Sequence, residues 1–94
     1  MHTAAEGLAT RIGFALPQQI LREHLDDFVL VSEDELRDAT VAMLEHTRNL
    51  IEPAGAAPLA AALELDLAGK KICLLASGGN MTLAQLRNLL AAPA

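Results

Sequence analysis

The chain has 94 residues, a formal net charge of −5 and an apolar fraction of 52%. A chain of this length forms one small domain at most. The negative charge argues against a nucleic-acid or anionic-membrane surface, and no apolar run approaches the roughly 20 residues that a membrane span needs. The N-terminus also lacks the basic and apolar regions of a signal peptide. We therefore expect a soluble, cytoplasmic protein.

The first third of the chain predicts a helix followed by a strand. Pro17 suits the first position of a helix, and the apolar residues up to Leu25 recur at helical spacing. The continuous apolar run 28–31 has the length of a strand. Such a run is typical of a strand that is buried on both faces of a parallel sheet.

The clearest helix start in the sequence is at Ser32. Its side chain can cap the backbone N–H of Glu35, and the Glu35 side chain can reach back to the Ser32 N–H. Apolar residues then fall at helical spacing over 36–50 for about four turns. His46 and Arg48 favour the carboxyl end of the same helix.

Residues 52–64 predict a second helix with an ambiguous beginning. Pro53 can stand at its first position, but Pro58 would then remove one hydrogen bond. The helix is either kinked at Pro58 or begins there. Gly69 is expected to close the connection to the next strand.

The last third predicts a strand, a tight turn and a helix. The apolar run 72–76 leads into Ser77-Gly78-Gly79-Asn80, and Thr82 with Gln85 forms a second capping box. Cys73 is expected to be a buried core thiol. The paired glycines are expected to adopt positive φ and to let a ligand approach the backbone.

The order helix, strand, helix, helix, strand, helix indicates an α/β fold with two parallel strands joined by a helical crossover. In such folds ligands bind at the carboxyl ends of the strands, where the 77–80 turn would lie. Two strands are too few for a stable sheet. The chain is therefore expected to be part of something larger.

Four landmarks occur in an order that resembles one enzyme family. They are residues 5–9, 29–35, 51–57 and 69–80. The chain resembles the carboxyl-terminal portion of pyridoxal-phosphate-dependent threonine dehydratases and serine racemases, in the fold type II or tryptophan-synthase-β-like group. The resemblance covers residues 3–91. It implies that residues 1–94 are one carboxyl-terminal fragment of a catalytic domain, with residues 1–2 as an added start.

The resemblance implies three residues on the cofactor side of the site. Ser77 matches the serine that hydrogen-bonds the ring nitrogen of pyridoxal phosphate, and Gly7 and Glu52 match positions beside the cofactor. Without the resemblance, the sequence is equally consistent with Ser77 as an ordinary turn residue. Glu52 reads equally well as an acid that stabilises a helix amino terminus.

The resemblance also places Glu6 on the substrate side, where the plain alternative is a solvated loop carboxylate. Asn80 and Arg48 match positions of a nucleotide effector site between subunits of serine racemases. Their plain alternatives are helix capping for Asn80 and a helix end for Arg48. The three histidines have no metal-ligand spacing, so we expect no metal site.

The chemistry of this family needs a Schiff-base lysine and a glycine-rich phosphate loop. The two lysines, Lys70 and Lys71, precede the 72–76 run, and six residues of strand separate Lys71 from the cofactor end by about 20 Å. We therefore expect no catalytic residue in this chain, and pyridoxal phosphate bound in the full-length parent and not to the chain alone.

The predicted function is the carboxyl-terminal part of a threonine (or serine) dehydratase, which eliminates water and ammonia from a β-hydroxy amino acid to give a 2-oxo acid. The expected partners are the amino-terminal part of the same enzyme, an amino-acid substrate and a second copy, with no nucleic acid or membrane. Two alternatives remain open at this point. The chain is either a non-catalytic, self-associating module or a small nucleotide-binding α/β module at the 77–80 turn.

Overall fold

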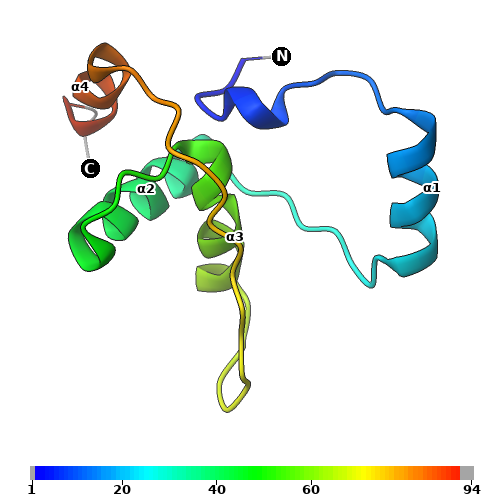
Figure 1. The fold of residues 1–94 in the computed structure, drawn as a ribbon. Coiled ribbons are helices and arrows are strands. Elements are labelled where there is room, and N and C mark those ends of the chain that lie inside the picture. The colour runs from blue at the N-terminus through cyan, green and yellow to red at the C-terminus, as the bar shows by residue number, and fades with distance from the viewer. Residues whose placement is uncertain (1, 92–94) are drawn as a thin grey trace.

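The computed structural model describes residues 2–91, which form helices and connecting segments (Figure 1). The elements in chain order are the 3-10 helix η1 (Glu6–Leu8) and the α-helices α1 (Ala15–His24), α2 (Glu33–Thr47), α3 (Pro53–Glu64) and α4 (Leu83–Ala91). Helices α2 and α3 pack on each other, and η1 packs on α3. Together these three elements position the site described below.

Helix α2 begins at the predicted capping box. The Glu35 N–H donates to Ser32 Oγ at 3.1 Å, and the Ser32 N–H donates to Glu35 Oε1 at 3.3 Å. The helix ends at Thr47 rather than at Leu50, because Arg48 adopts the left-handed conformation with φ 60°. The prediction of about four turns with His46 in the last one is confirmed.

Helix α3 settles the ambiguity about its two prolines. It begins with Pro53 at its first position and continues through Pro58 to Glu64. Pro58 lies in the interior, so the Ala54 carbonyl loses the N–H that would normally pair with it. The high alanine content of α3 lets the neighbouring segments approach its backbone closely.

The core lies between α2, α3 and the residue that precedes η1. The buried apolar residues are Ala5, Leu36, Ala39, Ala56 and Ala60. Thr40 is also buried, and its hydroxyl donates to the Leu36 carbonyl oxygen at 2.8 Å. The buried hydroxyl is therefore satisfied within α2. A core of mostly alanine side chains buries little apolar area per residue, so its contribution to stability is modest.

The two predicted strands are not strands in this structure. Both runs are extended, but none of residues 2–91 belongs to a strand. Phe28 is 74% exposed and Leu30 is 83% exposed, where the sequence predicted burial on both faces. A strand needs a neighbour to pair with its N–H and C=O groups, and no described segment provides one. The α/β prediction is thus not reproduced within residues 2–91.

Cys73 and Pro17 also differ from expectation. Cys73 is exposed rather than buried, because nothing in the described part of the chain covers the extended 72–76 run. Pro17 is the third residue of α1 rather than the first. Proline is tolerated there because the first N–H groups of a helix have no partner within it.

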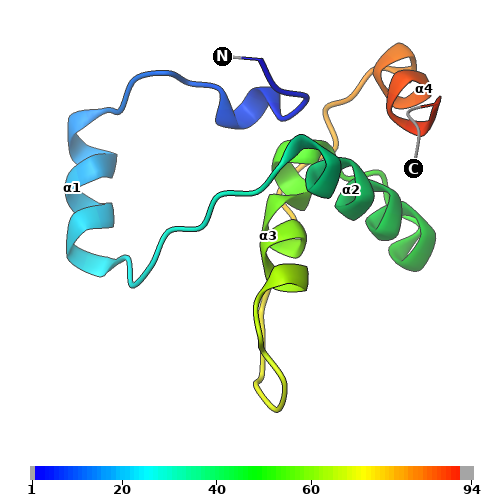
Figure 2. The ribbon, with the colours of Figure 1, turned by 180° about the vertical axis from the view of Figure 1, so that it is seen from behind.

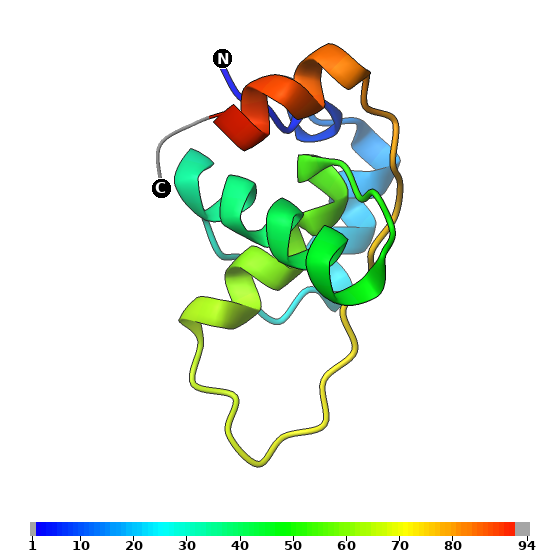
Figure 3. The same cartoon turned by 90° about the vertical axis from the view of Figure 1, so that its left-hand side faces the viewer.

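Helix α1 stands apart from the other helices, joined to them by extended segments (Figure 2). All of its residues are exposed. The loop between α3 and the 72–76 run also projects away from the helices (Figure 3). The Cα radius of gyration is accordingly 14.2 Å, whereas a compact domain of this length has about 12 Å.

Helix α4 begins at the second predicted capping box. The Gln85 N–H donates to Thr82 Oγ1 at 3.1 Å, and the Thr82 N–H donates to Gln85 Oε1 at 2.8 Å. None of the helices described between residues 2 and 91 is long and apolar enough to cross a membrane.

Candidate functional site

The 77–80 turn precedes α4 in the chain and packs against the segment that leads into α3. The Glu52 N–H donates to the Gly78 carbonyl oxygen at 2.9 Å, and the Asn80 N–H donates to Glu52 Oε1 at 3.4 Å. These contacts join parts of the chain that are 26 to 28 residues apart in sequence. They place Ser77 beside the first turn of α3, with its hydroxyl exposed.

The turn has glycine at 78 and 79 because other atoms approach its backbone closely, and not because the backbone adopts positive φ. Gly69 is the described glycine with positive φ, at 77°, so the prediction of positive φ for Gly78 and Gly79 is wrong. A Cβ on Gly78 would lie 2.9 Å from Glu52 Oε1, and a Cβ on Gly79 would collide with the Leu50 carbonyl oxygen. The turn needs glycine because neighbouring backbone and carboxylate atoms occupy that space.

Gly55 completes the close contact from the side of α3. A Cβ there would lie 3.0 Å from both the N and O atoms of Gly78. Gly55 lies within the 51–57 landmark, but the sequence alone indicates no role for it. A glycine at the third position of a helix, where propensity disfavours it, was the signal for this close packing.

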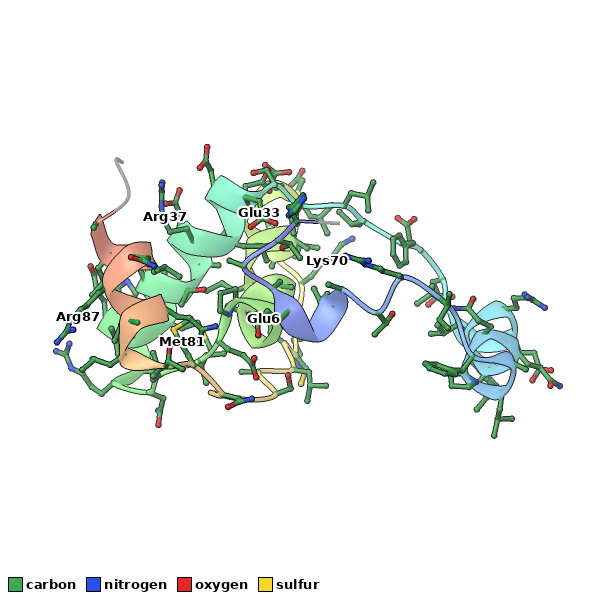
Figure 4. The ribbon with its side chains drawn as sticks, turned by 90° about the horizontal axis from the view of Figure 1, so that it is seen from above. Glu6, Glu33, Arg37, Lys70, Met81 and Arg87 are labelled. Atoms are coloured by element: carbon green, nitrogen blue, oxygen red, sulfur yellow. The ribbon has the colours of Figure 1, made fainter. Side chains whose placement is uncertain are left out.

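A cleft of about 410 Å³ opens beside the turn. It lies between α2, α4, η1 and the start of α3, and Figure 4 shows Glu33 and Arg37 on α2, Glu6 on η1 and Met81 before α4. Its lining residues are Ala4, Glu6, Glu33, Asp34, Arg37, Glu52, Pro53, Asn80, Met81, Gln85, Asn88 and Leu89. The cleft thus contains four carboxylates and one guanidinium, which is also paired with Asp34 and Asp38.

Glu6 and Gly7 reach the same region from η1. Gln85 Nε2 donates to Glu6 Oε1 at 3.2 Å, which links η1 to α4. A Cβ on Gly7 would lie 3.1 Å from the Ala54 Cβ, so glycine lets η1 lie close to the first turn of α3. Sequence reasoning gave Gln85 a capping role and missed its contact with Glu6.

The structure brings several of the predicted site residues together but leaves Ser77 and Arg48 outside the cleft lining. Glu6, Glu52 and Asn80 line the cleft, and Gly7 packs against Ala54 at the start of α3. Arg48 is not among the lining residues, and its guanidinium donates to the Glu45 carbonyl oxygen at 2.8 Å. That contact fits the alternative role of Arg48 at a helix end. Asn80 does not cap α4, because Thr82 does so.

The segment between α3 and the 72–76 run projects from the far end of α3 (Figure 1), and Lys70 and Lys71 belong to this segment. The Lys70 N–H donates to the Leu67 carbonyl oxygen at 3.1 Å in a turn that contains Gly69. Both lysines are exposed and neither lines the cleft. The described residues also contain no group of three or more histidine, cysteine or acidic side chains arranged to hold a metal ion.

One acidic pair lies outside this region. A hydrogen bond that the protonated Glu64 carboxyl donates to Glu35 raises the pKa of Glu64 from its ordinary value of 4.5, and repulsion between the two charges raises it further. The second Glu35 oxygen, Oε2, is buried and accepts no N–H or hydroxyl group among the described residues. Two neighbouring carboxyl groups favour a shared proton.

Comparison with known families decides what kind of protein contains this site. A family described as pyridoxal-phosphate dependent enzyme matches residues 1–78. The chain belongs to this family. Membership confirms the resemblance that the four landmarks indicate. It also supports an α/β fold for enzymes of this family. Within residues 2–91 of this chain, the regular secondary structure is helical.

The chain is also similar to several curated proteins. It is 46% identical over 82 residues to an L-threonine ammonia-lyase of Geobacter sulfurreducens, which covers 84% of the chain and 20% of that enzyme. It is 38% identical over 80 residues to an L-threonine ammonia-lyase of Thermotoga maritima, with the same coverage. It is 36% identical over 93 residues to a serine racemase of Dictyostelium discoideum, which covers 95% of the chain and 28% of that protein. The chain spans 20 to 28% of the length of these relatives.

Proposed function

We propose that the chain forms the carboxyl-terminal part of a pyridoxal-phosphate-dependent threonine (or serine) ammonia-lyase. The complete enzyme eliminates water from a β-hydroxy amino acid and releases ammonia and a 2-oxo acid. The similarity to two threonine ammonia-lyases supports this proposal. The partners are the rest of the enzyme, the amino-acid substrate and a second subunit.

The observation that carries the proposal is the arrangement of the 77–80 turn against α3. Glycine at 78 and 79 lets the turn lie directly against Glu52 and the Leu50 carbonyl oxygen, and Ser77 beside it is exposed. Its hydroxyl fits the ring nitrogen of pyridoxal phosphate. Gly7 and Glu52 lie at the same end of α3 and would border the ring. The described residues fit this edge of the cofactor and offer no lysine near it.

When bound, pyridoxal phosphate supplies an electron-accepting ring that promotes loss of the α-proton of an amino acid. Ser77 Oγ can donate a hydrogen bond to the ring nitrogen, but a neutral hydroxyl does not hold a proton on that nitrogen as a carboxylate would. The ring stays a mild electron acceptor. This property would favour loss of the substrate's β-hydroxyl. Glu6, which lines the cleft, would face the substrate.

The test replaces the matched fifth of the Geobacter sulfurreducens threonine ammonia-lyase with the corresponding residues of this chain. We expect the chimera to bind pyridoxal phosphate, with its visible absorbance, and to form 2-oxobutanoate from threonine. A matched chimera in which Gly79→Leu disrupts the turn should lose both properties. A chimera that cannot bind the cofactor, or that binds it without forming 2-oxobutanoate, would contradict the proposal.

A further inference from the structure

The Glu52 carboxylate is directed at the backbone of the 77–80 turn. Oε1 accepts the Asn80 N–H at 3.4 Å and lies 2.9 Å from the point that a Cβ on Gly78 would occupy. The side chain therefore fills the space over Gly78 and is half-buried there. The Oε1 atom of Glu52 is therefore engaged by the turn.

The backbone around Glu52 reinforces the same contact. Its N–H donates to the Gly78 carbonyl oxygen at 2.9 Å, and its carbonyl oxygen accepts the Ala56 N–H at 2.9 Å, which begins the α3 ladder. Two residues earlier, the Leu50 carbonyl oxygen lies against Gly79. Residue 52 thus joins the turn to the first turn of the helix that forms the core.

We propose that Glu52 is a positioning residue, which holds the 77–80 turn and through it the Ser77 hydroxyl. The role assigned to Ser77 rests on the proposed function, whereas the contact itself does not. An ionised carboxylate makes a stronger acceptor for a backbone N–H than a neutral group does. The extended 72–76 run is otherwise exposed, so this contact restrains the turn together with the backbone hydrogen bond from the Glu52 N–H to the Gly78 carbonyl oxygen.

The experiment follows backbone amides of the ¹⁵N-labelled 94-residue chain by NMR. In Glu52→Ala we expect the Asn80 amide to exchange with solvent about tenfold faster, since one hydrogen bond to a charged group is lost. The Ala60 amide, in the buried part of α3, should be unchanged. Glu52→Gln should restore most of the protection, because its amide oxygen can still accept the Asn80 N–H.

The matched control is Glu33→Ala, which removes another carboxylate from the same cleft. Glu33 Oε2 accepts the Ala4 N–H at 3.0 Å, so this variant should release Ala4 and leave Asn80 unchanged. A general response to lost negative charge would instead alter Asn80 in both variants.

Unchanged exchange of Asn80 in Glu52→Ala, or equally accelerated exchange of Asn80 in Glu33→Ala, would overturn the proposal. If the Ala variant unfolds, the Gln variant still decides the question, because its weaker acceptor should leave Asn80 measurably less protected than in the parent, and equal protection would count against the carboxylate. None of these readouts involves the cofactor. Failure of the proposed function would therefore leave them unchanged, and failure of this contact would leave the chimera test standing.

Discussion

Single residues of this chain are constrained by close contacts more than by backbone conformation. Gly79 and Gly69 illustrate the difference, because both are turn glycines with opposite requirements. Gly69 has φ 77° and open space around its α-carbon, whereas Gly79 faces the Leu50 carbonyl oxygen. The sequence identified both as turn residues, but the reason for each depends on what lies across from it in space.

Gly79→Ala should therefore displace the 77–80 turn. The added Cβ must push away the backbone at Leu50, a shift that costs about 1 to 3 kcal/mol. We expect the Glu52 N–H, which donates to Gly78, to exchange faster with solvent in hydrogen-exchange experiments. Gly69→Ala is the control, because it strains its own loop by about 1 kcal/mol without touching the turn. Equal protection of the Glu52 amide in the parent, Gly79→Ala and Gly69→Ala would contradict this explanation.

Glu64 should make the stability of the chain decrease as pH rises through the raised pKa of its carboxyl. The pKa of Glu64 in the folded chain lies above the ordinary value of 4.5, so the folded state binds the proton more tightly than the unfolded state does. The associated stability is fully present below 4.5 and is lost above the raised pKa.

Glu64→Gln should flatten this part of the pH profile and stabilise the chain at neutral pH, where the parent places two negative charges together. Urea unfolding from pH 4 to pH 8 measures the effect, with Glu45→Gln as a control of equal charge at an exposed position of α2. A profile of Glu64→Gln that parallels that of the parent would argue against the Glu35 contact as its cause.

At the scale of elements, the sequence predicts those features that depend on neighbours along the chain. The two capping boxes at Ser32 and Thr82 form as predicted, because their partners lie three residues away. The strands at 28–31 and 72–76 do not form, because a strand depends on another segment beside it. The contact between Glu52 and the 77–80 turn could not be predicted for the same reason. Family resemblance grouped these residues, and the structure supplied the contact.

Ser32→Ala should destabilise α2 by about 1 kcal/mol, since the Glu35 N–H loses its side-chain acceptor. Urea unfolding monitored by far-UV circular dichroism measures this loss. Ser77→Ala is the matched control, because the Ser77 hydroxyl is exposed and takes part in no hydrogen bond among the described residues. Equal effects of the two substitutions would show that the box contributes nothing specific.

At the scale of the molecule, the chain exposes more surface than a folded monomer of its size. Its accessible surface is 7280 Å², whereas a monomer of this mass has about 5,200 Å². The excess comes from α1 and the two extended runs, where large apolar residues such as Phe28, Leu30 and Leu75 are exposed. A difference of this size is comparable with the area buried in a specific protein–protein interface.

We predict that the isolated chain associates with itself. Unpaired extended runs and exposed apolar helix faces favour pairing with a second copy. Sedimentation velocity over a wide concentration range should give a weight-average mass that rises above the 9.9 kDa monomer. Leu30→Lys together with Leu75→Lys should shift association to higher concentration. A monomer at every concentration would contradict this prediction and favour a self-sufficient domain.

The central claim is that the Ser77 hydroxyl serves the ring nitrogen of pyridoxal phosphate in the complete enzyme. Its most direct test is the ¹⁵N NMR signal of the pyridine nitrogen, recorded with labelled cofactor in the chimera described above. We predict an unprotonated nitrogen with Ser77 and a protonated one in Ser77→Asp, where a carboxylate would hold the proton. The same signal with serine and with aspartate at position 77 would contradict the account.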